Sequence, residues 1–438
     1  MPSVNARPPL LGFWMCVALV VGNSIGSGVF LLPSALGPYG LNSLVAWAFT
    51  AVGALVLAVV FSQLSRAHPQ AGGPYAYTLL AFGPFPAFIV AWGYWVSIWV
   101  GNAAIATGGV SYLSPLLPWV ATVPGASAAL TVVILWVLTF VNWYGIKASG
   151  WVQSVTTVLK VMPLLAIAAL GLVSVRAHHV AAAAIVPLSI SGTTAAATLT
   201  LWALLGLESA TIPASKVRDP SRTIPRATLA GTLITTLICI LACSSVVLLI
   251  PPAKLAVSNA PFVDVAQQFW GVAAGRWLAV FAAISAFGCL NGWVLLQGEL
   301  PNVMAKGGVF PAAFGQDSAR QTPTFALVFS SGLVTALILA NYQASMVRIF
   351  TFMVLLSTTA SLVMYALCSL ALLRLTWTGR MGPKPMRSGL LAAVGILATL
   401  FSLWAIVGAG AEAVGYGCVL LGLGVPIYWL VRRQRRVR

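Results

Sequence analysis

The sequence predicts an all-α integral membrane protein with twelve transmembrane helices in a five-plus-five inverted repeat, whose first and sixth helices are broken. Three observations lead to this prediction. Hydrophobic residues form 60% of the 438-residue chain and charged residues only 7%, against roughly 25% charged residues in soluble domains. No Asp, Glu, Lys or Arg occurs in the 80 residues between Arg66 and Lys147. Residues 22–28 read Gly-Asn-Ser-Ile-Gly-Ser-Gly, a polar break inside the first apolar run.

Charge-free apolar runs that end at Pro, Gly or basic clusters mark the helices in order. Crossing the hydrocarbon core takes about 20 predominantly apolar residues. The first run is too long for a secretory signal peptide and lacks a charged start and a small-residue cleavage site. We expect spans at 10–37, 43–66, 82–113, 127–146, 152–175, 194–213, 225–250, 277–304, 323–341, 346–374, 389–408 and 411–431.

The basic residues set the expected orientation. With a cytoplasmic N-terminus, 18 Lys and Arg residues fall in cytoplasmic segments and four outside, as the positive-inside rule requires. Both termini are therefore predicted to be cytoplasmic, in a multi-pass protein of the plasma (inner) membrane. The basic end, 432–438, is expected to face anionic lipid headgroups. The net charge of +17 therefore does not indicate a nucleic-acid partner.

The expected organisation has one transport core flanked by shorter parts. The core is built from two inverted repeats of five helices, and two additional transmembrane helices follow it. The parts are a cytoplasmic N-terminus at 1–9, the core at 10–374 with repeats at about 10–175 and 194–374, the additional helices at 375–431 and a basic cytoplasmic C-terminus at 432–438.

The break at 22–28 carries the strongest functional signal. Non-helical backbone at mid-membrane depth is tolerated where it is buried in protein or lines a cavity, and in secondary transporters its freed N–H and C=O groups bind the substrate. The sixth span holds Gly206 and Glu208 and is followed by Pro213. Two breaks five spans apart indicate the inverted repeat. The alternative interpretation of the second break is a packing glycine beside a hydrogen-bonded carboxylate on a cavity surface.

Lys160 lies within the fifth span, and ionisable residues inside a membrane are usually functional. Its ammonium group is expected to occupy the place of a bound Na⁺, against carbonyl groups of the broken first helix. The alternative is an interfacial anchor whose ammonium group reaches the cytoplasmic headgroups.

The remaining reactive residues predict neither a metal site nor a cofactor. Cys239 and Cys243 are one helical turn apart, but no His and no third Cys joins them. The cysteines are therefore expected to pack between helices. An enzyme would need a catalytic cluster, which six scattered acidic residues do not provide. A channel would favour a continuous polar stripe, and the sequence has none.

Five motifs follow one another along the predicted spans. They are Gly22-Asn23-x-x-Gly26-Ser27-Gly28-Val29-Phe30-Leu31-Leu32-Pro33, Gly72-Gly73-Pro74-Tyr75-Ala76-Tyr77, Tyr94-Trp95 with Trp99-x-Gly101-Asn102, Leu201-Trp202 with Gly206-x-Glu208-Ser209, and Gly292-Trp293. In this order and on these spans, they resemble the amino acid–polyamine–organocation superfamily of transporters over nearly the whole chain. The resemblance is closest to its basic amino acid/polyamine antiporter branch, which includes the bacterial arginine/agmatine antiporters.

The resemblance implies a LeuT-like fold and a binding site for an amino acid or amine. The N–H groups around Ser27 and Gly28 would bind the substrate carboxylate. Carbonyl groups around Asn23 and Ser24, near the Gly26 break, and those near Trp202 and Leu205 would accept from the ammonium group. By the same resemblance, Asn102, Trp202, Trp293 and Ser357 line the side-chain pocket. Trp293 would also be a mid-depth gate, and Tyr94, Glu208 and Tyr365 a thicker, pH-responsive cytoplasmic gate.

Some residues depart from the arginine/agmatine pattern. Lys160 lies at a place where the resemblance implies an apolar stretch of helix in those antiporters. Ser24, Ser97, Ile98 and Ile105 also differ from the residues that line their side-chain pocket. We expect Na⁺-independent exchange of an amino acid, cationic in the first interpretation, for its decarboxylated amine or another amino acid. The alternative is a proton-coupled or exchange permease for neutral amino acids. Membrane lipids are expected partners, and the sequence leaves a homodimer open.

Overall fold

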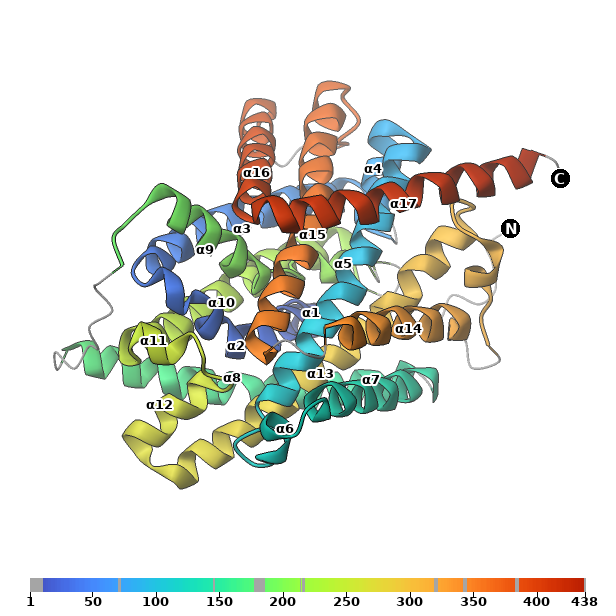
Figure 1. The fold of residues 1–438 in the computed structure, drawn as a ribbon. Helices are drawn as coiled ribbons and strands as arrows, with labels where there is room; N and C mark the ends of the chain where they lie inside the picture. Colours follow the sequence, from blue (N-terminus) through green and yellow to red (C-terminus); the bar gives the residue numbers. More distant parts are fainter. Residues whose placement is uncertain are drawn as a thin grey trace.

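The protein is built from helices throughout its described part. The computed structural model describes residues 11–69, 72–144, 146–176, 186–212, 214, 217–318, 322–341, 345–382 and 386–436. Within these ranges the helices are joined by turns and short extended segments, and the β-structure is limited to an isolated bridge between Leu11 and Val217. Figure 1 shows the helices crossing around a centre that contains α1, α2, α5, α13 and α15.

Seventeen α-helices and three short 3₁₀ helices, labelled α and η, follow one another along the described chain. They are α1 (Phe13–Ser24), α2 (Ser27–Leu36), η1 (Gly37–Tyr39), α3 (Asn42–Ala67), α4 (Pro74–Phe82), α5 (Pro84–Ser111), α6 (Trp119–Thr122), α7 (Ala126–Tyr144), α8 (Ile146–Arg176), α9 (Ile190–Trp202), η3 (Ser209–Thr211), α10 (Pro220–Leu249), α11 (Pro252–Leu255), α12 (Pro261–Trp270), α13 (Val272–Lys306), η5 (Ala312–Gly315), α14 (Thr324–Ala340), α15 (Met346–Trp377), α16 (Ser388–Gly408) and α17 (Gly410–Arg436).

Ten segments of the described chain are long and apolar enough to cross a membrane. They identify an all-helical, multi-pass membrane protein. One of them, Phe13–Tyr39, runs through α1, α2 and η1. Two predicted spans correspond to shorter helices: α14 has 17 residues, and α9 has 13 residues because it ends where the sixth span is interrupted.

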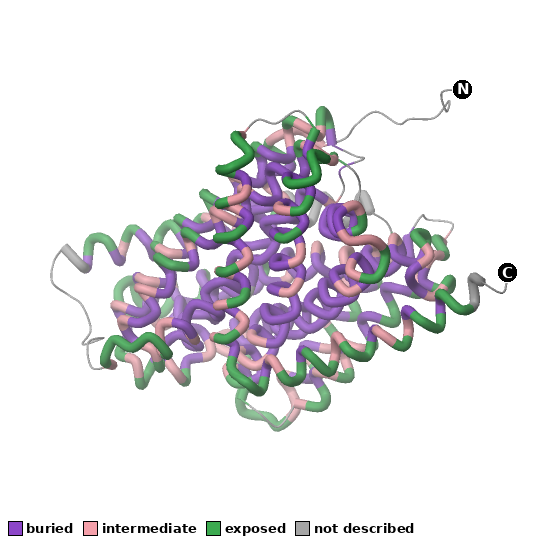
Figure 2. The backbone as a smooth tube through the Cα atoms, turned by 90° about the horizontal axis from the view of Figure 1, so that it is seen from above, coloured by how far each residue is buried: buried purple, intermediate pink, exposed green. Residues whose placement is uncertain are grey.

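Burial increases from the outer helices toward the centre, as the colours of Figure 2 show. Helix α5 is buried along nearly its whole length, from Ala87 to Ser111, and packs against α13 and α15. The outer helices expose large apolar side chains, such as Phe140 on α7 and Leu400 on α16. Exposed apolar side chains are stable on these helices because the surrounding solvent is lipid.

The first membrane segment is interrupted near its middle. Helix α1 ends at Ser24, and Ile25 takes an extended conformation with φ −83° and ψ 93°. Gly26 is also extended, and α2 begins at Ser27. Glycines and asparagine are poor helix formers, so the sequence at 22–28 favours a break here.

A second interruption follows α9. The chain leaves the α-helical path after Trp202 and makes tight turns in which Leu204 and Leu205 donate to carbonyl groups three residues back. Gly206 then has φ +101°, a conformation that side chains with a Cβ rarely adopt. The short helix η3 begins at Ser209. The first and second interruptions approach each other in the centre of the molecule.

Candidate functional site

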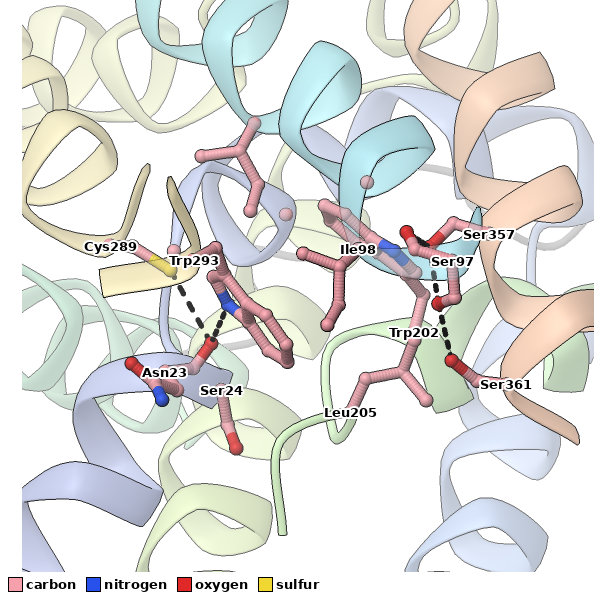
Figure 3. A pocket seen from close by; sticks show the side chains of 14 residues that line it. Asn23, Ser24, Ser97, Ile98, Trp202, Leu205, Cys289, Trp293, Ser357 and Ser361 are labelled. Carbon is pink, nitrogen blue, oxygen red and sulfur yellow. Dashed lines mark hydrogen bonds between the residues drawn. The ribbon is translucent and has the colours of Figure 1, made fainter. Parts of the chain in front are cut away.

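A narrow cavity of about 30 Å³ lies where the two interruptions meet α5, α13 and α15. Its wall mixes small polar residues with two tryptophans and branched apolar side chains. None of the described lining residues is acidic or basic. They are Asn23, Ser24, Gly26, Gly28, Ser97, Ile98, Gly101, Ile105, Trp202, Leu205, Cys289, Trp293, Ser357 and Ser361 (Figure 3).

Helix α2 begins at the wall of this cavity. The N–H groups of Ser27 and Gly28 belong to its first turn, where an α-helix has no partners within itself. A Cβ atom on Gly28 would overlap the ring of Trp202, and one on Gly26 would collide with the Cys289 thiol. The two glycines therefore bring bare backbone to the cavity, at the positive end of a helix dipole. Such an arrangement favours an anionic group.

Asn23 connects the two interruptions. Its side-chain amide donates to the hydroxyl oxygen of Ser209 across 3.0 Å, and a Cβ on Gly206 would lie 3.3 Å from the Cβ of Asn23. The main-chain carbonyl of Asn23 accepts from the indole N–H of Trp293 at 2.9 Å and from the thiol of Cys289 at 3.4 Å. We expected this carbonyl to accept from the substrate, but in this structure protein donors already occupy it.

Lys160 of α8 lies behind the first interruption. Its Nζ donates to the carbonyl oxygens of Gly22 and Ile25, each at 2.8 Å, and its side chain is fully buried. An interfacial anchor would place the ammonium group at the membrane surface, whereas here it caps two carbonyl groups of the broken helix. Together with Trp293 and Cys289, it provides partners for the carbonyl groups that the break releases.

A buried hydrogen-bonded cluster forms around Glu208, in the interruption that follows α9. The carboxylate of Glu208 accepts from the hydroxyl of Tyr94 at Oε1 and from that of Tyr365 at Oε2, each at 2.7 Å. Its main-chain carbonyl accepts from the hydroxyl of Thr211 at 2.7 Å. The cluster ties the chain after α9 to α5 and α15, so these three elements cannot separate here without losing charge-assisted hydrogen bonds.

Three serines form another polar group on the cavity wall. The hydroxyl of Ser357 donates to the carbonyl of Ser97 at 2.8 Å. The hydroxyl oxygen of Ser97 lies 3.1 Å from that of Ser357 and also contacts that of Ser361. In Figure 3 the serines are well separated from Asn23, Ser24 and Cys289. The cavity therefore has two polar ends.

A family model described as "Amino acid permease" matches residues 11–417. The chain belongs to this family. The permease is similar to the putrescine transporter PotE of Haemophilus influenzae, with 29% identity over 437 residues and 98% of each chain covered. It is 32% identical over 336 residues to the cadaverine/lysine antiporter of Escherichia coli (strain K12), with 75% of this chain and 74% of the relative covered. Membership identifies a transporter rather than an enzyme and implies a LeuT-like fold.

The permease structure brings most of the expected site residues together. Asn23, Ser24, Gly26, Gly28, Trp202, Leu205, Trp293 and Ser357 all line the cavity, and Tyr94, Glu208 and Tyr365 share one hydrogen-bonded cluster. The backbone of Ser27 begins α2, but its side chain lies outside the described residues.

Asn102 departs from the expected position in the pocket. Its neighbour Gly101 lines the cavity, whereas the amide of Asn102 donates to Oε1 of Gln297 at 2.7 Å. The Gln297 amide in turn donates to the hydroxyl of Ser331 on α14 at 2.8 Å. Successive residues of an α-helix point about 100° apart, so a residue beside a wall residue can face a neighbouring helix. In this structure Asn102 supports the scaffold between α5 and α13.

Two lining residues were not selected from the sequence. Ser361 follows Ser357 by four residues on α15, and Cys289 precedes Trp293 by four residues on α13. Residues four apart share a face of an α-helix, so this spacing was the signal that could have found both. Among the described residues, no group of three or more His, Cys, Asp or Glu side chains could hold a metal ion.

Proposed function

We propose that this permease is a secondary active transporter that exchanges amino acids, or an amino acid and an amine, by alternating access without Na⁺. The observation that carries the proposal is the meeting of the two helix interruptions at a cavity with no charged side chain in its described lining. A zwitterion needs partners for an anion and a cation on adjacent atoms. Backbone N–H and C=O groups at helix breaks offer both kinds of partner.

We propose that the fold contains twelve transmembrane helices. In this arrangement α1 with α2, and α9 with the chain through η3, each form one broken span. Inverted repeats then cover about 10–175 and 194–374, and residues 375–431 form two additional helices. The distribution of basic residues supports cytoplasmic termini in a plasma membrane, and the family match supports the LeuT-like repeat.

The substrate carboxylate is assigned to the N–H groups of Ser27 and Gly28, at the dipole-positive start of α2. The ammonium group is assigned to carbonyl groups at the interruptions, including that of Ser24. Trp202 and Trp293 would cover the substrate, and an indole face attracts a cation by about 2 kcal/mol or more when both are desolvated. The names of the relatives, a putrescine transporter and a cadaverine/lysine antiporter, favour a cationic amino acid and its amine as the exchanged pair.

Lys160 supports Na⁺ independence. Its ammonium group holds the carbonyl oxygens of Gly22 and Ile25, where a bound cation would otherwise be required to satisfy the broken helix. Because the cation is covalently part of the chain, the break stays organised in the absence of salt. The same positive charge behind the site also supports the second candidate, a permease for neutral amino acids, since it disfavours an additional cation nearby.

We propose that alternating access is controlled by two gates at the cavity. Trp293 is proposed to form the mid-depth gate and the Glu208 cluster the cytoplasmic gate. The cytoplasmic gate opens when Tyr94 and Tyr365 separate from the carboxylate, while the broken helices rock against α5, α13 and α15. In the present conformation both hydroxyl contacts are made.

Counterflow from proteoliposomes tests the proposal. Vesicles loaded with lysine should take up labelled lysine from outside. They should also release their lysine faster when lysine or cadaverine is added outside. Replacing Na⁺ by choline should leave the initial rate of exchange unchanged. Net uptake driven by a proton gradient, without acceleration by external substrate, would favour the proton-coupled alternative. Counterflow with leucine but not lysine would favour the neutral exchanger.

A further inference from the structure

A groove of about 490 Å³ opens on the outside of the molecule between α3, α16 and the start of α9 (Figure 1). Its described lining shares no residue with that of the central cavity. Its volume falls in the range of about 300–1,000 Å³ that is typical of ligand sites. Apolar side chains form most of the wall, among them Val45, Phe49, Ile190, Phe401 and Trp404.

The hydroxyl groups in this wall already serve the start of α9. The hydroxyl of Thr193 donates to Oδ1 of Asn42 at 3.1 Å, and that of Thr194 donates to the carbonyl four residues before it at 2.7 Å. The hydroxyl oxygen of Ser189 accepts from the N–H of Gly192 at 3.0 Å. The surface that remains for an occupant of the groove is therefore mainly hydrocarbon.

The groove is continuous with the lipid-facing surface of the protein. On α3, Phe49 in the wall and Val52 in the following turn are both exposed, and on α16 the exposed Leu403 and Val407 flank the wall residue Trp404. Exposed apolar side chains on membrane helices lie against lipid. Hydrocarbon chains of the bilayer are therefore the solvent that reaches this groove.

The packing of the three helices limits the shape of the occupant. The hydroxyl of Thr198 donates to the carbonyl of Ala405 on α16 at 2.7 Å, and the hydroxyl oxygens of Thr50 and Thr200 lie 2.7 Å apart between α3 and α9. These contacts hold α9 against both neighbours, so the gap is confined to the first turns of α9. Because an α-helix is about 10–12 Å across and rises about 5.4 Å per turn, the groove has room for roughly one helical turn. A slender, flexible chain fits it better than a helix of a second copy.

We propose that this groove binds one acyl chain of a membrane phospholipid, in the leaflet that surrounds the start of α9. This is the outer leaflet in the proposed topology. An unfilled gap between apolar walls forfeits dispersion contacts, and a chain lying along the rings of Phe49, Phe401 and Trp404 restores them. The inference goes beyond the proposed exchange, because it assigns a lipid site that the substrate does not use. Since α9 runs from the groove to Trp202, the bound chain supports the outer part of the second broken span.

Photolabelling tests the site with a phosphatidylethanolamine that carries a diazirine in one acyl chain. The full-length protein is reconstituted with this probe, extracted into detergent, washed to remove loosely held lipid, irradiated and digested for mass spectrometry. The label that survives washing should concentrate on residues 45–49, 188–194 and 401–404. We expect it to exceed the label on other lipid-facing segments at least about tenfold, which corresponds to roughly 1.4 kcal/mol of preference.

Two matched variants separate the groove from the general lipid surface. Val45→Trp places an indole in the groove and should reduce the retained label there severalfold. Val52→Trp makes the same change two turns further along α3, at a residue outside the described lining of the groove, and should leave the label unchanged. Ile190→Ser puts a polar group in the wall at a residue that is 87% exposed, so folding is preserved and the label should again fall. Size-exclusion chromatography checks that each variant is folded.

The inference is overturned if washed wild-type protein carries no more label at the groove than on other lipid-facing segments. It is also overturned if Val45→Trp keeps the wild-type label, or if Val45→Trp and Val52→Trp lose it equally. Absent label together with crosslinking of two copies through Phe49→Cys would show instead that the groove is an interface between copies of this chain. None of these readouts depends on exchange. A protein with counterflow but no retained label keeps the proposed function and loses this site, and a labelled protein without counterflow does the reverse.

Discussion

The indole N–H of Trp293 donates to the main-chain carbonyl of Asn23 across 2.9 Å, so α13 is tied directly to the last turn of α1. The same carbonyl accepts from the Cys289 thiol. Both donors come from one face of α13 and hold a carbonyl that lies next to the break. Trp293 is therefore a wall of the cavity and, at the same time, a support for the backbone that forms it.

Replacing Trp293 with leucine should strongly reduce transport while the protein remains folded. Leucine removes both the indole face and the N–H bond to Asn23, yet stays apolar in a cavity wall. Uptake in proteoliposomes should fall at least about tenfold, in line with the loss of a hydrogen bond of roughly 1 kcal/mol together with the indole contact. Elution as one symmetrical peak in size-exclusion chromatography checks folding. The matched control is Trp377→Leu, because Trp377 is 93% exposed at the end of α15. Unaltered uptake by Trp293→Leu would remove this residue from the transport site.

Gly28→Ala should impair substrate binding through Trp202. The added methyl group would overlap the Trp202 ring, so the ring or the start of α2 has to move within the cavity. We expect substrate affinity, measured by calorimetry, to fall by at least about tenfold, since overpacking typically costs about 1–3 kcal/mol. Gly332→Ala on α14 is the control, because a Cβ there meets no atom within 4 Å. Equal affinity for the Gly28 variant and the wild type would show that Trp202 does not contribute to the site.

The sequence predicted the parts of this arrangement that depend on backbone chemistry. Glycines and Asn23 at 22–28 mark a break because they are poor helix formers in an apolar run. Gly206, with Glu208 and the following Pro213, marked the second break, and the structure gives Gly206 a positive φ there. The motifs did not predict how each helix is rotated about its own axis, and so which side chains face the cavity. Asn102 belongs to the expected pattern, yet it faces Gln297 rather than the cavity. That direction is decided by how α5 packs against α13, which no local pattern encodes.

The sequence also missed structure that lies between the long apolar runs. Helix α12 is short and stands in a predicted connection, so a search for membrane spans passes over it. Ser97 and Ser357 were expected in the pocket lining, but Ser361 and its contact with Ser97 were missed, because the two residues lie on different helices, 264 residues apart in the chain. Small residues such as serine are common in membrane helices as packing residues. Only their contact in the folded structure distinguishes these serines from serines that merely pack between helices.

Lys160→Ala should destabilise the protein and stop transport together. The variant leaves the carbonyl oxygens of Gly22 and Ile25 without their ammonium partner, at a position where the lysine side chain is fully buried. Hydrogen bonds to charged groups contribute roughly 1.5–3 kcal/mol each. A fall of several degrees in the thermal unfolding midpoint is therefore expected, as followed by tryptophan fluorescence. Lys254→Ala, at an exposed lysine of α11, should leave the midpoint unchanged. If Lys160→Ala unfolds at the wild-type temperature and still transports, the ammonium group does not organise the break.

Glu208→Gln should change how transport depends on pH. Each carboxylate oxygen of Glu208 accepts from one tyrosine hydroxyl, at 2.7 Å in both cases. A glutamine amide keeps one accepting oxygen, but its NH₂ group cannot accept from the second tyrosine. That tyrosine can only accept from the NH₂ group instead, so both contacts lose the negative charge of the carboxylate, and the titrating group is removed from the proposed cytoplasmic gate. Exchange rates of the variant should therefore stay nearly constant across a pH range in which the wild type varies. Glu412→Gln, at an exposed residue in the first turn of α17, is the control and should keep the wild-type profile. If Glu208→Gln and the wild type have the same pH profile, protonation of this carboxylate does not set the rate, and the tyrosines act as a hydrogen-bonded closure alone.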